Sequence, residues 1–296
     1  MTLKNVSLCL AALVVACLVL AGYGKARWNA GTTQLLYRLD AAQVKSAPQF
    51  YNAKELEGLP APVKRYFQTV LKDGQPIITA ATVQHMGTFN MSETGQSWKP
   101  FTSTQRVTTN RPGFDWDARV MMFPVGLGIA VHIHDAYVGG SGLLKAAVLG
   151  LIPIANLPET ADLSKGELMR FYMEAAWYPT ALLPSQGVVW KAVDATSADA
   201  TFTDAGITIN LRFGFGADGL IHTVLAAERG RLVGNQTTQA PWQGRFSNYA
   251  DRGGMLVPLQ SEVAWILPVG VKTYYRSLMT TVSYEFSAPP DRKPKS

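Results

Sequence analysis

The stretch Thr201–Gly230, TFTDAGITINLRFGFGADGLIHTVLAAERG, decides the fold class of this chain. Apolar and polar residues alternate along three short runs, which are separated by the turn sequences Asp204-Ala205-Gly206 and Ala217-Asp218-Gly219. A period of two places successive side chains on opposite faces of a strand, and glycine accommodates the backbone of a tight turn. The stretch therefore predicts three consecutive antiparallel strands joined by hairpins.

The same alternation extends in both directions along the chain, from Ala80 to Met121 and from Trp242 to Phe286. About eight to eleven strands with few helices are expected, which indicates a mainly β (α+β) protein with a curved antiparallel sheet or half-barrel. No fixed-period repeat or low-complexity linker divides the pattern, so we expect a single domain over residues 59–287. Residues 28–58 are then a connecting segment and residues 288–296 a disordered tail.

An apolar run without any charged residue extends from Asn5 to Gly24. At 1.5 Å per residue, a helix of this length crosses the roughly 30 Å hydrocarbon layer of a bilayer. Residues 1–27 are therefore predicted to contain a transmembrane helix that anchors the chain, because the run is long for a signal peptide. A cleaved signal peptide and a lipoprotein signal ending at Cys17 are the alternatives.

The position of the apolar run also indicates where the body of the protein lies. The charges on its two flanks are nearly balanced, but a short amino-terminal tail usually stays in the cytoplasm. We therefore expect a single-pass protein of the inner (cytoplasmic) membrane with its body on the periplasmic side. Both cysteines, Cys9 and Cys17, lie inside the run, so the body has no disulfide and no thiol chemistry.

The composition of the chain excludes some classes of function. Hydrophobic residues make up 47% of the chain and charged residues 16%, which is ample material for a core. The formal net charge is +6, but much of the positive charge lies at Lys25 and Arg27 and in the tail after Asp291. Because no basic stripe interleaved with aromatic residues occurs in the body, we do not expect the protein to bind nucleic acid.

Two short motifs could suggest a cofactor or a metal, but their context argues against both. Gly214–Gly219 matches G-x-G-x-x-G, yet a strand rather than a helix follows it, so the match is a hairpin turn and not a dinucleotide site. His132 and His134 point to one side of a strand, whereas zinc needs a third and usually a fourth ligand. We therefore expect no cofactor and no metal.

One helix is predicted between Leu59 and Pro76. Val63, Tyr66, Phe67 and Val70 recur at helical spacing, and charged or polar residues occupy the opposite face. This amphipathic helix is expected to pack on the sheet.

Two segments in the middle of the chain break the strand pattern. Gly142–Pro158 is apolar with one charged residue, and Gly166–Ser185 reads GELMRFYMEAAWYPTALLPS. Ser164 and Glu167 form an S-x-x-E capping box that predicts a helix as far as about Ala176. We interpret both segments as interruptions of the sheet, and the helix as a lid or floor over an apolar concavity.

The helix brings Glu167, Arg170 and Glu174 to one face. These residues have a structural role if Glu167 caps the helix and Glu174 forms an i, i+4 salt bridge with Arg170. Contact with the headgroup of a ligand is one alternative, and acid–base catalysis is another. The aromatic and aliphatic residues nearby are either ordinary core or the lining of a pocket. The residues proposed to bind a ligand are Glu167, Arg170, Glu174, Trp177, Leu182, Leu183, Trp190, His134, Tyr137, Arg106 and Arg119.

Five motifs carry a resemblance to an uncharacterised bacterial family of anchored or exported proteins. They are L-P-x-P-V-x-R-Y-F (59–67), G-F-x-W-x-A-R (113–119), DAYVGGSGL (135–143), W-x-P-T-A-L-L-P-S (177–185) and P-W-x-G-x-F-x-x-Y (241–249). The third departs slightly from the family in its glycine spacing, and the resemblance implies no function. The architecture also resembles the lipoprotein-carrier (LolA-like) superfamily, whose half-barrels hold acyl chains, although no motif is shared.

The sequence thus predicts a membrane-anchored, extracytoplasmic protein that binds a lipid or another hydrophobic small molecule in a half-barrel. One alternative is a hydrolase that acts on a lipid or a sugar through Glu167 and Glu174. Another is a structural subunit of an envelope complex. The membrane and an apolar ligand are the expected partners, and the sequence indicates no particular protein partner.

Overall fold

The computed structural model describes residues 3–44, 49–122, 129–234 and 236–287, and the tail expected at 288–296 lies outside them. The helical segments are α1 (Leu3–Ala42), η1 (Ala53–Leu56), α2 (Ala61–Val70), α3 (Ala161–Met173), η2 (Glu174–Trp177), η3 (Pro179–Leu182) and η4 (Pro184–Gln186). The strands are β1 (Ile78–Asn90), β2 (Trp98–Thr108), β3 (Gly113–Met121), β4 (Ala130–Val138), β5 (Ser141–Val148), β6 (Ile152–Asn156), β7 (Val189–Ala192), β8 (Ser197–Asp204), β9 (Ile207–Phe215), β10 (Ile221–Val233), β11 (Gln236–Arg252), β12 (Met255–Leu267) and β13 (Gly270–Phe286).

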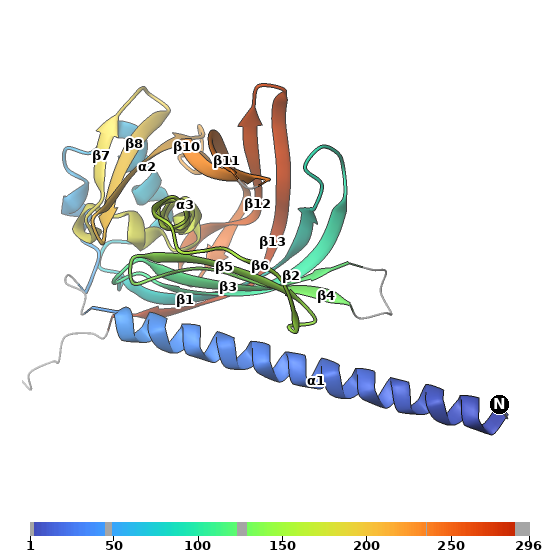
Figure 1. Ribbon diagram of the computed structural model, residues 1–296. Coiled ribbons are helices and arrows are strands. Elements are labelled where there is room, and N and C mark those ends of the chain that lie inside the picture. The colour runs from blue at the N-terminus through green and yellow to red at the C-terminus, as the bar shows by residue number, and fades with distance from the viewer. Residues whose placement is uncertain (1–2, 45–48, 123–128, 235, 288–296) are drawn as a thin grey trace, which may run out of the picture.

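The thirteen strands of the described residues form one open, curved antiparallel sheet in the order β6-β5-β4-β3-β2-β1-β13-β12-β11-β10-β9-β8-β7 (Figure 1). This arrangement confirms the predicted fold class and exceeds the expected number of strands. Consecutive strands pair with each other from β1 to β6, and again from β7 to β13. The two meanders meet where β1 pairs with β13. The first and last strands of the chain therefore lie side by side in the middle of the sheet.

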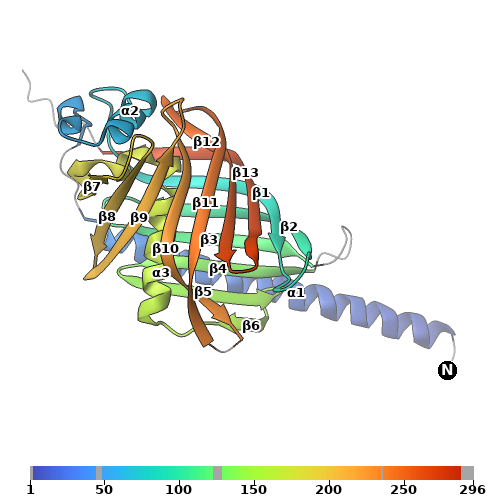
Figure 2. The same cartoon turned by 90° about the horizontal axis from the view of Figure 1, so that it is seen from above.

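The helical segment between β6 and β7 connects the two edges of the sheet across its concave face (Figures 1 and 2). Helix α3 begins after Thr160, whose side chain accepts a hydrogen bond from the backbone N–H of Leu163. The predicted capping box is therefore wrong, because Thr160 is the N-cap and the Ser164 hydroxyl instead accepts the backbone N–H of Gly142. The helix ends at Met173 and continues as short 3₁₀ turns.

The apolar segment Gly142–Pro158 does not interrupt the sheet. It forms most of β5 and all of β6, which pair with each other and continue the sheet beyond β4. The sequence pattern was misleading because both strands carry apolar residues on both faces. Of the two predicted interruptions, only the helical segment after Thr160 leaves the sheet.

Helix α2 confirms the predicted amphipathic helix. Its buried face contains Val63, Tyr66, Phe67 and Val70, all 2% exposed or less. The Tyr66 ring lies near Phe215, and the Phe67 ring lies edge-on to Trp190. This helix and its neighbours fill one part of the concave face with ordinary core.

Helix α1 is longer than the predicted apolar run, because it continues without a break to Ala42. By length and composition it is the one helix of the described residues that could cross a membrane, either as an anchor or as part of a signal sequence. Its second half packs along the convex side of the sheet (Figures 1 and 2), where Trp28, Leu35 and Leu39 are buried. Residues 28–42 of the expected connecting segment therefore belong to the same helix as the apolar run and dock it on the body.

Candidate functional site

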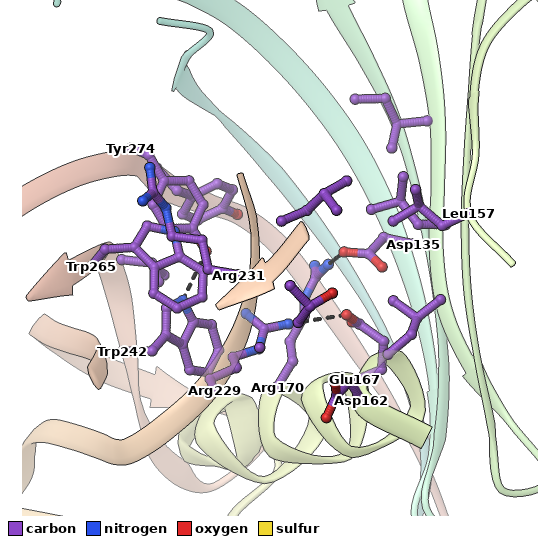
Figure 3. A pocket seen from close by; sticks show the side chains of 18 of the residues that line it. Asp135, Leu157, Asp162, Glu167, Arg170, Arg229, Arg231, Trp242, Trp265 and Tyr274 are labelled. Carbon is purple, nitrogen blue, oxygen red and sulfur yellow. Dashed lines mark hydrogen bonds and ion pairs between the residues drawn. The ribbon is translucent and has the colours of Figure 1, made fainter. Parts of the chain in front are cut away.

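A pocket of about 720 Å³ lies between α3 and the inner face of the sheet. Strands β3, β4 and β5 form one wall, and β10 to β13 form the opposite wall (Figure 3). Glu167, Arg170 and Glu174 project from the α3 segment and form what we call the floor. The loop between β1 and β2 supplies Ser92 and Glu93 to the rim.

The register of the sheet explains why particular side chains meet in the first wall. Gln105 pairs with Trp116, Trp116 with Asp135, and Asp135 with Leu144, so one row crosses four strands. Residues that are directly opposite in an antiparallel pair point to the same face. Trp116, Asp135 and Leu144 therefore all line the pocket, while Gln105 lies beneath Glu174 and donates a 2.7 Å hydrogen bond to it.

The floor is a buried network of charges. The Arg170 guanidinium contacts the Asp135 carboxylate, and its Nε lies 2.8 Å from Glu174 Oε1. Arg229 Nη2 lies 3.0 Å from Glu167 Oε1. All of these residues except Asp135 are at most 9% exposed. Ionic groups at such depth persist only when they are paired, so the network fixes α3 to β4 and β10.

The network holds three carboxyl groups, from Asp135, Glu167 and Glu174, against the guanidinium groups of Arg170 and Arg229. Burial raises the pKa of Glu167 to about 8, and the neighbouring Asp135 carboxylate adds to this shift. Burial alone opposes the charge on Arg170, but the carboxylates of Glu174, Asp135 and Glu167 together raise its pKa well above its ordinary value. A proton on Glu167 leaves the network with balanced charge.

The wall opposite Asp135 is aromatic. Trp242 and Trp265 are directly opposite each other on β11 and β12. The Trp265 ring stacks on Tyr274 at 6.2 Å between centroids, and Trp242 Nε1 donates a 2.9 Å hydrogen bond to the Tyr274 hydroxyl. The Arg229 guanidinium lies 3.9 Å from the centroid of Trp242. This contact stabilises both the cation and the orientation of the ring.

The rim carries a second set of charges. Glu93 reaches across from the loop between β1 and β2 to pair with Arg231, and its carboxylate lies 3.6 Å from Lys272 Nζ. The Glu93 side chain is 71% exposed, whereas those of Arg231 and Lys272 are 15% and 19% exposed. The contact therefore joins an exposed carboxylate of the loop to two mostly buried cations of β10 and β13.

Several buried polar atoms of the pocket residues have no hydrogen-bond partner in the described part of the chain. They are Asp135 Oδ1, Glu167 Oε2 and Arg229 Nε. Buried polar groups are nearly always satisfied by protein, water or ligand. Because each of these atoms is closed off from solvent, a molecule in the pocket can reach them only if neighbouring side chains move.

The structure brings together three of the residues predicted from the sequence, Glu167, Arg170 and Glu174, which line the pocket. The Arg170–Glu174 pair forms as predicted. Glu167 does not cap α3, since its partner is Arg229 of β10. Both oxygens of Glu174 are engaged, one by Arg170 and the other by Gln105.

Four apolar residues proposed for the ligand site lie in the core instead of the pocket lining. Trp177 is 2% exposed and packs against His85 and Phe246. Leu182 and Leu183 are fully buried, and Trp190 Nε1 donates to the Leu182 carbonyl. Trp190 lies on β7 and packs against Phe67 of α2, while the other three lie on or beside the 3₁₀ turns after α3, outside the pocket lining.

Four polar residues proposed for the site also lie elsewhere. His134 is on the convex face, where its ring stacks on Trp28 and its Nδ1 lies 2.8 Å from Asp115 Oδ1. Arg119 pairs with Asp117 beside Trp28, and Arg106 pairs with Glu285 and Asp40. The Tyr137 hydroxyl donates to Asp204. Each of these groups already has a structural partner.

Sequence reasoning missed most of the second wall. Arg229, Arg231, Trp242, Trp265, Lys272 and Tyr274 all line the pocket. The alternation within β10 to β13 indicated that these residues belong to faces of strands. It did not indicate which face is the concave one, because that depends on where α3 lies.

The G-x-G-x-x-G match is a turn, as predicted: Gly214 lies near the end of β9, and Gly219 has a φ of 78° just before β10. Among the described residues, no group of three or more His, Cys, Asp or Glu side chains is arranged to hold a metal ion.

Comparisons with known proteins give a family but no established activity. Residues 57–284 match DUF6920, a family of unknown function. No curated protein matches the chain. Among solved structures, a LolA superfamily protein from Nitrosomonas europaea is similar, with 10% sequence identity and a TM-score of 0.39 over 82% of this chain and 96% of that one.

Proposed function

The chain belongs to the DUF6920 family, and from its geometry we propose that it holds a lipid or another hydrophobic small molecule in the pocket between α3 and the sheet. The observation that carries this proposal is a pocket of about 720 Å³ whose walls are mainly aliphatic and aromatic. Its size falls within the roughly 300–1,000 Å³ of typical small-molecule sites.

The apolar lining gives the driving force for binding. Ile133, Leu144, Leu157 and Val263 face the pocket together with the aromatic wall. Removing apolar surface from water contributes roughly 25 cal/mol per Å². An acyl chain or a comparable apolar body gains this contribution without any rearrangement of the sheet.

The charges at the rim favour a ligand that also has a polar end. Arg231 and Lys272 line the pocket, and their partner Glu93 has a side chain that is 71% exposed. An acid or phosphate group can pair with these two cations, whereas a pure hydrocarbon makes no such contact. We therefore propose an amphiphilic ligand with its polar end near the rim.

Helix α1 supports a location at a membrane for this activity. We propose that it is retained as a single-pass anchor in the cytoplasmic membrane, with the body on the periplasmic side as one folded domain. The docking of residues 28–42 on the sheet supports retention, because cleavage after the apolar run would leave this half of the helix without its continuation.

Catalysis by Glu167 and Glu174 is not favoured by their contacts. A general base needs a free oxygen near its substrate, and both oxygens of Glu174 are occupied. Glu167 is 3% exposed and paired with Arg229. No described contact favours the envelope-complex alternative.

Occlusion of the pocket tests the proposal. Val263 is half-buried and lines the pocket, so Val263→Trp is expected to fill the space without removing a polar contact. The full chain in lipid nanodiscs would be exposed to a photoactivatable fatty acid, and the crosslinked peptides mapped by mass spectrometry. We expect labelling of β5 and β12 to fall several-fold in Val263→Trp.

The control is Leu278→Trp, which places the same ring on an exposed position of β13 away from the pocket. Its labelling is expected to equal that of the unmodified protein. Labelling that is confined to α1, or that is unchanged by Val263→Trp, would contradict the proposal.

A further inference from the structure

The edge strand β6 exposes two large apolar side chains. Ile152 is 64% exposed and Ile154 is 55% exposed, and β6 is the last strand on its side of the sheet. An exposed apolar edge strand pairs readily with other chains unless something covers it. The strand thus has an uncovered surface for which neither the core nor the pocket gives a reason.

The turn between β5 and β6 is held directly against α1. A Cβ atom on Gly24 would lie 2.3 Å from the Leu149 carbonyl oxygen, and one on Gly150 would lie 2.7 Å from the Gly24 carbonyl oxygen. Arg27 also donates a 3.4 Å hydrogen bond to the Leu151 carbonyl. Only glycine at both positions allows this approach, so the hairpin has a fixed height along the helix.

The hairpin contacts α1 at the residue where the apolar run ends. Gly24 is its last residue, and the exposed charged residues Lys25 and Arg27 follow at once. Tyr23, next to Gly24, is 61% exposed, and tyrosine is enriched where helices leave the hydrocarbon layer. Strand β6 leads back from the turn beside Trp28, because the Trp28 ring contacts His132, His132 pairs with Ala147, and Ala147 pairs with Pro153. Ile152 and Ile154 therefore lie about one turn of α1, roughly 5 Å, to the body side of this boundary, at the depth of the lipid headgroups.

We infer that the β5–β6 hairpin lies against the bilayer surface, with Ile152 and Ile154 in contact with the headgroup region of the lipids. The bilayer covers the otherwise exposed edge, and Lys25 and Arg27 lie level with anionic headgroups. The hairpin and α1 together orient the body relative to the membrane. This inference does not depend on what occupies the pocket.

Depth-dependent quenching tests the inference. In the full chain with Cys9→Ser and Cys17→Ser, Ile154→Cys would be labelled with the fluorophore NBD and reconstituted into phosphatidylethanolamine/phosphatidylglycerol vesicles. The vesicles also contain phosphatidylcholine with a nitroxide on its headgroup as the quencher. We expect several-fold stronger quenching at position 154 than at Asn210→Cys, an exposed position on β9 towards the other edge of the sheet.

Equal quenching at the two positions would overturn the inference. The inference would also be overturned if neither the lipid nitroxide nor aqueous iodide quenched the label at position 154, and if this shielding increased with the ratio of protein to lipid. A second copy of the chain would then cover β6.

The contact at Gly24 is tested with a matched pair of variants. Gly24→Leu forces the hairpin away from α1, whereas the position of a Cβ on Gly22 is open. Quenching at position 154 is expected to fall in Gly24→Leu and to stay unchanged in Gly22→Leu. Unchanged quenching in both variants would show that the hairpin is not held at the membrane by this contact.

Discussion

Arg170 lies between two carboxylates that come from different elements, Glu174 of its own helical segment and Asp135 of β4. Its guanidinium also lies 5.0 Å from the ring centroids of Phe114 and Trp116. Removal of one member of a buried ionic network leaves uncompensated charge in a medium that solvates it poorly. The pocket floor therefore depends on this residue for its stability as well as its shape.

We expect Arg170→Met to lower the free energy of unfolding by about 3–5 kcal/mol. Urea denaturation followed by tryptophan fluorescence measures the loss. Arg212→Met is the control, because the Arg212 side chain is 51% exposed and exposed ion pairs contribute little. Similar losses in the two variants would contradict the role assigned to the buried network.

Glu167 gives the protein a specific dependence on pH. Because its pKa is raised from 4.5 to about 8 in the folded state, the folded protein binds a proton more tightly than the unfolded chain. The stabilisation is fully present below pH 4.5 and is lost as the pH rises towards 8. Glu167→Gln mimics the protonated side chain and has no proton to lose.

We therefore expect the stability of the unmodified protein, relative to Glu167→Gln, to decrease between pH 5 and pH 8. The difference in urea midpoint between the two proteins at each pH isolates Glu167 from other titrating groups. A difference that stays constant over this range would show that the folded pKa of Glu167 is not raised.

At the scale of single elements, the β1–β2 hairpin braces the rim of the pocket. Glu93 is the residue of its loop that contacts Arg231 of β10 and Lys272 of β13. An exposed ion pair of this kind contributes about 0–1 kcal/mol, so the contact can open at low cost. The hairpin can thus move away from the rim of the pocket without unfolding of the sheet.

We expect Glu93→Gln to leave the melting temperature nearly unchanged and to speed the photolabelling of the pocket. Hydrogen exchange of residues 91–97 should also become faster, because the loop loses its ion pairs across the rim and keeps only the hydrogen bond from Lys272 to the Glu93 carbonyl. Glu262→Gln, which breaks an exposed pair with Arg276, is the matched control. Identical labelling rates in the two variants would contradict a bracing role for Glu93.

At the scale of the whole molecule, α1 joins the apolar run to the convex face of the sheet. Trp28 stacks on His134 at 4.5 Å between ring centroids, and its Nε1 donates to Asp117. Thr32 also donates to Asp117, and Leu39 is 1% exposed against the sheet. The strands that carry these contacts, β3 and β4, present their other face to the pocket.

We expect Trp28→Ala to release this half of the helix, since truncation of a buried tryptophan costs about 3–5 kcal/mol. Amide hydrogen exchange of residues 29–42 should accelerate strongly, while β13 keeps its protection. Tyr37→Ala is the control, because Tyr37 is on the same helix and 74% exposed. Equal exchange in the two variants would mean that Trp28 does not hold the helix on the sheet.

The sequence by itself determined the local structure and the class of fold. Alternation along Thr201–Gly230 and its turn glycines specify hairpins, and the stripe at Val63–Val70 specifies α2, because backbone geometry and side-chain period are local properties. The ion pair between Arg170 and Glu174 could be predicted for the same reason, because a helix brings side chains four residues apart next to each other. A site on the α3 segment could therefore be proposed from sequence.

Only the tertiary structure decided which faces meet. Sequence separation does not indicate that Glu167 pairs with Arg229, or that His134 contacts α1 while Asp135 faces the pocket. These contacts depend on the pairing of β1 with β13 and on the passage of α3 from one edge of the sheet to the other. The free energy of a contact between distant segments depends on the whole arrangement that brings them together, and no local pattern encodes it.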